Sequence, residues 1–176
     1  DLLAGRFRLG RRIGRGGIGY VWLAEDVQLE NELVACKILK EDLYYDRRAV
    51  SDLKREVLLT RRLRHPNIVA VHSFWETPNT RFITMEYIEG VNLADALMDR
   101  RSPFDFAEIL PWIRQLGDAL DYAHGQDVLH RDVKPGNILL GREGSVHLAD
   151  FGIARLASEA PTRLTGETTC GTLMYV

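Results

Sequence analysis

Four segments in the first half of the chain have the hydrophobic pattern of β-strands. In RFRLGRRIG (6–14) apolar and basic residues alternate, which predicts a strand with one buried face. The other three are short apolar runs rich in residues that favour strands: GYVWLAED (19–26), ELVACKIL (32–39) and FITMEYI (82–88). The first half of the chain is therefore predicted to be rich in strands.

Two longer stretches follow the period of an α-helix. The segment AVSDLKREVLLTRRLRH (49–65) has Ser51 and Asp52 suited to a first helical turn, and its apolar face consists of Val50, Leu53, Val57 and Leu58. A second helix is predicted from Asp105 to Gly125, with a repeating apolar face made of Phe106, Ile109, Leu110, Ile113, Leu116, Leu120 and Ala123.

Pro111 lies about two turns inside the second helix, where proline removes a backbone donor and clashes with the preceding turn. We therefore expect either a kink at this position or a helix that starts later. Asn92 is predicted to cap a short helix, and short strands are predicted for VLH (128–130), ILL (138–140) and VHLA (146–149). The contrast between the two halves predicts two lobes, connected by residues 86–91.

The composition excludes several classes of protein. The net charge of −2, from 23 basic and 25 acidic residues, creates no overall field that favours nucleic acid or an anionic membrane, so neither partner is predicted for this segment. No stretch resembles a membrane span or a signal peptide. Cys36 and Cys170 are too few for a disulfide framework, which favours free thiols and a cytoplasmic location. The oligomeric state is left open.

Two motifs in the first half have an ordinary and a functional interpretation. Gly14, Gly16 and Gly19 form a G-x-G-x-x-G pattern between two predicted strands, which suits either a plain hairpin turn or a flap whose backbone approaches phosphates closely. Lys37 lies in an apolar strand and is either on the solvated face or buried with a carboxylate partner. Glu56, on the first predicted helix, is the best candidate for that partner.

The segment HRDVKPGNILL (130–140) places costly polar groups directly before an apolar strand. Asp132 can accept a proton or orient a hydroxyl, and Lys134 can neutralise a phosphate. Asn137, with Asp150 in the later segment LADFGIA, supplies the oxygen ligands that magnesium prefers. DFG alone also suits an ordinary turn, but the whole set in this order is very improbable by chance.

These motifs, GRGGIG, VACK, HRDVKPGN and DFG, resemble those of eukaryotic-type protein kinases, and HRDVKPGNILL and DFGIAR are similar to bacterial serine/threonine kinases. The resemblance implies an α+β, two-lobed kinase-like fold. Residues 1–86 would form a complete antiparallel N-lobe sheet with one main helix. Residues 87–176 would form the hinge and an incomplete, helix-led C-lobe, because CGTLMYV stops before the A-P-E motif.

The resemblance also implies ATP and Mg²⁺ as cofactors. Lys37, paired with Glu56, would hold the α- and β-phosphates, Asp132 and Lys134 would serve the transfer, and Asn137 and Asp150 would hold magnesium. The residues implied to bind the nucleotide, with Met85 as gatekeeper, are Ile13, Gly14, Gly16, Gly19, Val21, Ala35, Lys37, Met85, Glu86, Ile88 and Leu139.

The implied reaction is transfer of the γ-phosphoryl group to serine or threonine hydroxyls of a protein substrate. The alternatives are a non-catalytic, nucleotide-binding pseudokinase-like module and an inactive fragment; a small-molecule phosphotransferase is disfavoured by DFG and by Gly171 and Thr172. Apolar surface near His130 and the last helix is expected to be exposed. Arg131 implies a phosphate-ordered activation segment, with Thr168 as the first candidate and Thr165 and Thr169 as alternates.

Overall fold

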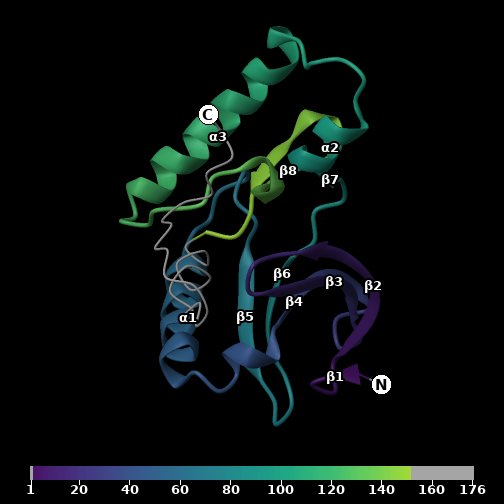
Figure 1. Ribbon diagram of the computed structural model, residues 1–176, viewed down its shortest axis with the longest axis vertical. Helices are drawn as coiled ribbons and strands as arrows, with labels where there is room; N and C mark the ends of the chain where they lie inside the picture. The colour runs from purple at the N-terminus through teal and green to yellow at the C-terminus, as the bar shows by residue number, and fades with distance from the viewer. Residues whose placement is uncertain (1, 152–176) are drawn as a thin grey trace, which may run out of the picture.

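A six-stranded antiparallel sheet occupies the first half of the chain in this computed structural model, which describes residues 2–151 (Figure 1). The sheet has the order β1-β2-β3-β4-β6-β5. Its strands are β1 (Leu2–Leu3), β2 (Phe7–Arg15), β3 (Gly19–Asp26), β4 (Glu32–Leu39), β5 (Val71–Glu76) and β6 (Arg81–Glu86). The predicted bounds of β3 and β4 are confirmed, β2 is shifted by one residue, and β6 ends two residues earlier than expected.

The long helix of this half is α1 (Arg47–Thr60), which lies beside β5 (Figure 1). It begins earlier than predicted, because the carboxylate of Asp46 caps it by accepting hydrogen bonds from Arg48 and Ala49. Its buried face is Val50, Leu53, Val57 and Thr60, whereas Leu58, which was expected on that face, is 59% exposed. Positions three and four apart therefore define the face, and Leu58 directly follows Val57 on the outer side.

The second half contains α2 (Leu93–Asp99), α3 (Phe106–His124) and a small sheet of β7 (Val91–Asn92), β8 (Ile138–Leu140) and β9 (Val146–Leu148). Short 3-10 turns precede and separate these strands at Pro135–Asn137 and Arg142–Gly144, and another follows β4 at Glu41–Leu43. The Asn92 cap is confirmed, since its side chain accepts a hydrogen bond from Asp95. No strand forms at residues 128–130, so that prediction is wrong.

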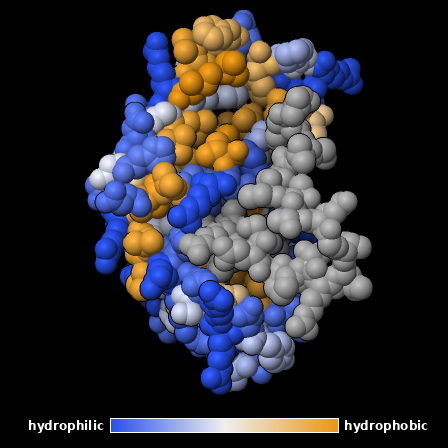
Figure 2. All heavy atoms as spheres, turned by 60° about the vertical axis from the view of Figure 1, so that its left-hand side comes forward, coloured by the Kyte–Doolittle hydropathy of each residue, from blue (hydrophilic) through white to orange (hydrophobic). Residues whose placement is uncertain are grey.

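Helix α3 runs continuously through Pro111, so the predicted later start is wrong. Its first turn is fixed by Glu108, whose carboxylate accepts a 2.8 Å hydrogen bond from the backbone N–H of Asp105. Only Ala119 and Ala123 of this helix are buried, and Figure 2 shows apolar side chains gathered on the upper part of the molecule. The expected exposed apolar surface is present at Phe106, Ile113, Leu129 and Val133.

Three buried clusters hold these parts together. One lies between the sheet and α1 and includes Ile18, Leu53 and Ile83, and a second packs α3 against β8 and β9. The third covers the other side of the sheet, where the rings of Phe7, Trp75 and Phe82 pack together. The sheet is therefore buried on both faces near its centre. Lys37, in the central strand β4, is only 2% exposed.

The segment that follows α1 connects it to the second half. The backbone of Asn67 accepts a hydrogen bond from Leu148, and its side chain donates to Gln115 and to the carbonyl of Val146. The hydroxyl of Tyr122 accepts from the backbone N–H of Arg64. These contacts join the C-terminal end of α1 to α3 and β9.

Candidate active site

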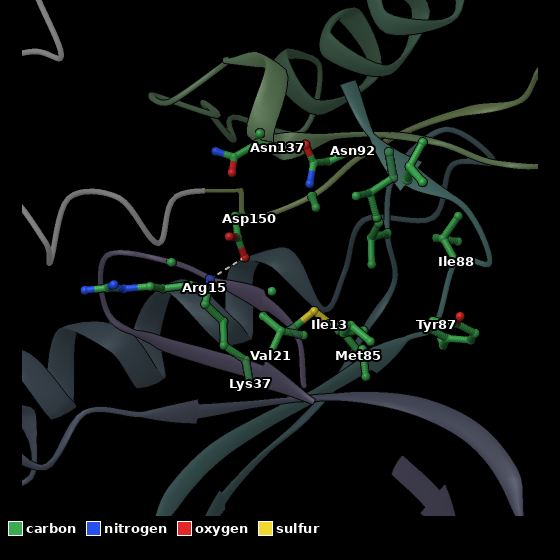
Figure 3. Close-up of a pocket in the computed structure, with 18 of the residues that line it drawn as sticks. Ile13, Arg15, Val21, Lys37, Met85, Tyr87, Ile88, Asn92, Asn137 and Asp150 are labelled. Carbon is green, nitrogen blue, oxygen red and sulfur yellow. Dashed lines mark ion pairs between the residues drawn. The ribbon is translucent and has the colours of Figure 1, made fainter. Parts of the chain in front are cut away.

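A cleft of about 780 Å³ lies between the six-stranded sheet and the segment that contains β8 (Figure 3). Of the residues predicted to serve catalysis, nucleotide binding or metal binding, all line this cleft except Gly19 and Glu56. The two halves of the chain contribute different groups. The sheet supplies the glycine-rich loop and Lys37, and the second half supplies Asp132, Lys134, Asn137 and Asp150.

One end of the cleft is apolar. Ile13, Val21 and Ala35 line it from the sheet, and Leu139 of β8 lines it from the second half. Figure 3 shows Met85, from β6, near Tyr87 and Ile88, which belong to the segment that connects the two halves. A flat aromatic base suits such a slot, since apolar side chains line both sides and the connecting backbone of residues 86–88 runs along its edge.

The glycine-rich loop approaches the opposite end. A Cβ atom added to Gly16 would lie 3.5 Å from the Nζ atom of Lys37, so the loop backbone runs close above this side chain. Gly19 is needed for a different reason, because a Cβ there would lie 2.0 Å from the carbonyl oxygen of Ile38 on β4. Gly19 does not line the cleft, and its place is explained by the close approach of β3 to β4.

Lys37 pairs with Asp150, and not with Glu56. Its Nζ atom lies 2.6 Å from Oδ1 of Asp150, with the lysine side chain 2% exposed and the aspartate 26% exposed (Figure 3). Glu56 instead lies 3.5 Å from a guanidinium nitrogen of Arg131. The Lys37–Glu56 pair expected from the sequence is therefore not formed here, because each of its members has another partner of opposite charge.

Hydrogen bonds within the loop 130–137 hold the catalytic candidates in place. Nζ of Lys134 lies 2.6 Å from Oδ2 of Asp132, and the side-chain amide of Asn137 donates to the backbone carbonyl and to Oδ2 of Asp132 at 2.8 and 3.1 Å. Arg131 and Asp150 both have left-handed backbones, with φ of 68° and 62°. Such φ values are uncommon outside glycine and concentrate at functional sites.

His130 is buried under this loop. Its Nδ1 atom accepts a 3.2 Å hydrogen bond from the backbone N–H of Asp132, so Nε2 carries the proton and donates to the carbonyl of Ala149 at 2.8 Å. Burial lowers the pKa of His130, more than the bond to Ala149 raises it, which keeps the ring neutral. The ring also packs on Phe151, with centroids 4.5 Å apart, and thereby connects the loop 130–137 to the segment that follows β9.

The oxygen atoms of Asn137 and Asp150 fit a magnesium ion. The amide nitrogen of Asn137 is used by Asp132, which leaves its carbonyl oxygen as an acceptor, and only one carboxylate oxygen of Asp150 is bound to Lys37. Both side chains line the same cleft, and Figure 3 shows them on the same side of it. Carboxylate and amide oxygens, completed by water and phosphate, are the usual ligands of Mg²⁺.

Several lining residues were not identified from the sequence. Asn92 and Asp95 face the cleft as a mutually hydrogen-bonded pair, and Arg15 and Lys40 add two cations to its lining. Asn92 was interpreted only as a helix cap, and Arg15 lies inside the glycine-rich motif, in which only the glycines were assigned a role. The candidate phosphorylation sites Thr165, Thr168 and Thr169 and the third residue of DFG, Gly152, lie outside the described residues.

A family model described as the protein kinase domain matches residues 7–176, and the chain therefore belongs to the protein kinase family. Among curated proteins, it is 39% identical to the serine/threonine-protein kinase PknE of Mycobacterium bovis over 98% of this chain and 30% of that protein. It is 37% identical to the serine/threonine-protein kinase PknA of Mycobacterium tuberculosis over 99% of this chain and 41% of that protein.

The fold is likewise shared with solved kinase domains. The crystal structure of the Mycobacterium tuberculosis PknI kinase domain superposes with a TM-score of 0.76 at 32% identity, covering 87% of this chain and 60% of that one. The two-lobed kinase fold expected from the motifs is thus confirmed. The chain spans less than half of the curated relatives named above, and no helix within residues 2–151 is long and apolar enough to cross a membrane.

Proposed function

We propose that this chain forms the nucleotide-binding and catalytic part of a serine/threonine protein kinase, which uses ATP and Mg²⁺. The observation that carries this proposal is the placement of Lys37, Asp132, Lys134, Asn137 and Asp150 in one cleft beside an apolar slot. We assign residues 1–86 to the N-lobe and residues 87–176 to the hinge and C-lobe. Because the reaction consumes ATP, we place this part of the protein in the cytoplasm.

Each group has a role that follows from its charge and position. The adenine would lie between Val21 and Leu139, with the backbone of Glu86 and Ile88 as its hydrogen-bond partners. Lys37 would bind the α- and β-phosphates, while Asn137 and Asp150 would hold magnesium, which neutralises phosphate charge.

Asp132 would orient the substrate hydroxyl and accept its proton, and the hydrogen bonds from Asn137 fix the direction of its carboxylate. Lys134, now 2.6 Å from Asp132, would turn to the transferred phosphoryl group and offset its negative charge. The new bond joins the hydroxyl oxygen to the γ-phosphorus, and the bond to the β-phosphate oxygen breaks, so that ADP leaves with that oxygen.

The residues of two ion pairs must change partners before the proposed nucleotide and metal contacts can form. Lys37 is bound to Asp150, which is the proposed magnesium ligand, and Glu56 is bound to Arg131. When Glu56 moves to Lys37, Asp150 becomes available to the metal. The observed pairs therefore describe a resting state of the proposed kinase.

The test is phosphoryl transfer from radiolabelled ATP by the purified full-length protein to a serine- and threonine-containing protein such as casein. Asp132→Asn should lower the rate by at least about 100-fold, as expected for loss of a general base. Asp118→Asn, a matched change on the exposed side of α3, should leave the rate unchanged. Transfer that survives Asp132→Asn would contradict the assigned role.

A second candidate is a non-catalytic module that binds nucleotide. One observation favours it: Glu56 forms its ion pair with Arg131 and not with Lys37. The same protein distinguishes the two candidates. Binding of ATP and Mg²⁺ measured by calorimetry, combined with no transfer to any protein or to the chain itself, would favour the non-catalytic module.

A further inference from the structure

Strand β2 carries an unusual set of charges. Its sequence, FRLGRRIGR, contains four arginines and no acidic residue. Arg8 has a carboxylate partner on the neighbouring strand, since it lies 2.6 Å from Glu25. Arg11, Arg12 and Arg15 have no carboxylate oxygen within 4.0 Å among residues 2–151. Cations without counter-ions are therefore concentrated toward the end of β2 that enters the glycine-rich loop.

Two of these arginines share one aromatic ring. The guanidinium carbons of Arg12 and Arg15 lie 5.3 and 5.9 Å from the ring centroid of Tyr20 on β3. The ring is attractive to each cation, but it does not neutralise either, and two neighbouring cations repel one another. The arrangement keeps two exposed guanidinium groups together at the C-terminal end of β2, where an anion would relieve their repulsion.

The loop position of Arg15 brings this charge to the reaction end of the cleft. Arg15 lines the cleft and is exposed, and Figure 3 shows its side chain extending outward beside Lys37 and Asp150, away from the apolar end. Lys40 also lines the cleft and is tied to the loop, because its backbone N–H donates a 2.9 Å hydrogen bond to the carbonyl of Ile18. We call Arg12, Arg15 and Lys40 the basic rim.

We propose, on the basis of the phosphoryl-transfer function proposed above, that the basic rim binds carboxylates of the protein substrate and selects serine or threonine residues with acidic neighbours. Arg15 and Asp132 line the same cleft, so the neighbours of a hydroxyl that reaches Asp132 from solvent would pass close to Arg15. The phosphates of ATP have other cations within the cleft, Lys37 and Lys134. An exposed guanidinium pair outside these lysines is suited to the planar carboxylates of aspartate and glutamate.

The test compares two peptides on the full-length protein: one with a central serine flanked by glutamates, and a matched peptide with glutamines. Wild type should have a lower KM for the glutamate peptide, and the difference should shrink in high salt, since exposed pairs are screened. The substitutions Arg12→Gln and Arg15→Gln each remove one charge of the basic rim. Each should raise the KM for the glutamate peptide about two- to fivefold, which is the size of effect expected for an exposed ion pair. The KM for ATP should stay unchanged.

Two variants serve as controls. Arg8→Gln removes the same charge from the same strand, but about 23 Å from Arg15 along β2, at ~3.3 Å per residue, and should leave the peptide preference intact. Arg15→Lys keeps the charge and should retain most of the preference. Equal KM values for the two peptides in wild type would overturn the proposal. So would an Arg15→Gln variant that raises the KM for ATP and leaves the preference for glutamate unchanged, because Arg15 would then bind nucleotide.

A binding measurement tests the proposal for the basic rim independently of the proposed kinase function. If no peptide is phosphorylated, the catalytic function fails, and fluorescence anisotropy with a labelled glutamate peptide still tests the rim. Binding that is weakened in the Arg12→Gln/Arg15→Gln double variant and unchanged in Arg8→Gln supports the rim. No difference between the glutamate and glutamine peptides in this assay overturns it.

Discussion

A carboxylate oxygen of Glu56 on α1 lies 3.5 Å from a guanidinium nitrogen of Arg131 in the loop 130–137, whereas the resemblance implied Lys37 as its partner. Arg131 is the residue directly before the proposed catalytic Asp132, so this contact joins the helix to the loop that carries that residue. Meanwhile Lys37 is held by Asp150 at 2.6 Å. In the proposed resting state, Lys37 and Glu56 therefore each have another partner, and the proposed magnesium ligand Asp150 is bound to Lys37.

The Glu56–Arg131 contact should therefore weaken when nucleotide binds. A double-mutant cycle with Glu56→Gln and Arg131→Gln, measured by urea unfolding, should give a coupling of about 0.2–1 kcal/mol without nucleotide, the range for partly exposed pairs. With ATP and Mg²⁺ present, the coupling should fall toward zero as Glu56 turns to Lys37. A coupling that is the same in both conditions would show that Glu56 does not change partner.

Asp150→Asn should separate metal-dependent from metal-independent nucleotide binding. The change removes an anionic ligand, so calorimetry should show weaker ATP binding in the presence of Mg²⁺ by about tenfold or more, the size of effect expected when a charged contact is lost. In EDTA the difference between wild type and variant should be much smaller. Asp95→Asn, a matched change at the other side of the cleft, controls for general loss of charge. Equal affinities in both conditions would remove Asp150 from the metal site.

Two glycines of the same motif should respond differently to alanine. Gly19→Ala places a Cβ 2.0 Å from the carbonyl oxygen of Ile38, and overpacking against backbone should destabilise the fold by about 1–3 kcal/mol or more. Gly14→Ala meets only the side chain of Val21, at 3.6 Å, and should be close to wild type in stability. Thermal unfolding of both variants makes the comparison. Similar melting temperatures would contradict the packing role of Gly19.

Stability should fall on the acidic side of neutrality. Burial lowers the pKa of His130 and of His147, so the unfolded chain binds more protons than the folded chain once the pH drops below about 6.5. Burying the two rings in their neutral form therefore costs no proton above that pH. As the pH falls below it, the free energy of unfolding decreases, because the unfolded chain takes up protons that the folded chain does not. Urea unfolding at pH 7.5 and 5.5 should show the loss. His147→Gln should reduce the pH dependence, whereas His124→Gln, on an exposed ring, should leave it unchanged.

Most of the strands were predicted from the sequence, and nearly all of the predicted site residues line the cleft, because both are encoded locally. β3 and β4 have their predicted bounds since their apolar runs end at charged or turn residues. Strand β5, VHSFWE, was missed because polar residues interrupt its apolar positions. Its strand conformation comes from pairing with β6, which a local pattern does not reveal.

It was harder to predict which charged side chains form ion pairs with one another than to predict where they lie in the fold. The observed pairs are Lys37 with Asp150 and Glu56 with Arg131. The sequence contains no signal that these pairs form instead of the pair Lys37–Glu56. Asn92 and Arg15 were missed as cleft residues for another reason. Asn92 was already explained as a helix cap, and Arg15 lies in the glycine-rich motif, in which only the glycines were assigned a role.

The hydrogen bonds of Asn67 and Tyr122 anchor the segment that follows α1, so we expect any rotation of this helix to pivot at its C-terminal end. Glu56 lies four residues from Thr60 and Arg47 lies thirteen, so at ~1.5 Å per residue their distances from that pivot are about 6 and 20 Å. A rotation that carries Glu56 from Arg131 toward Lys37 would displace the start of the helix about three times as far. A spin label at Arg47 would thus report the position of Glu56 with a threefold magnified movement, at a site remote from the nucleotide.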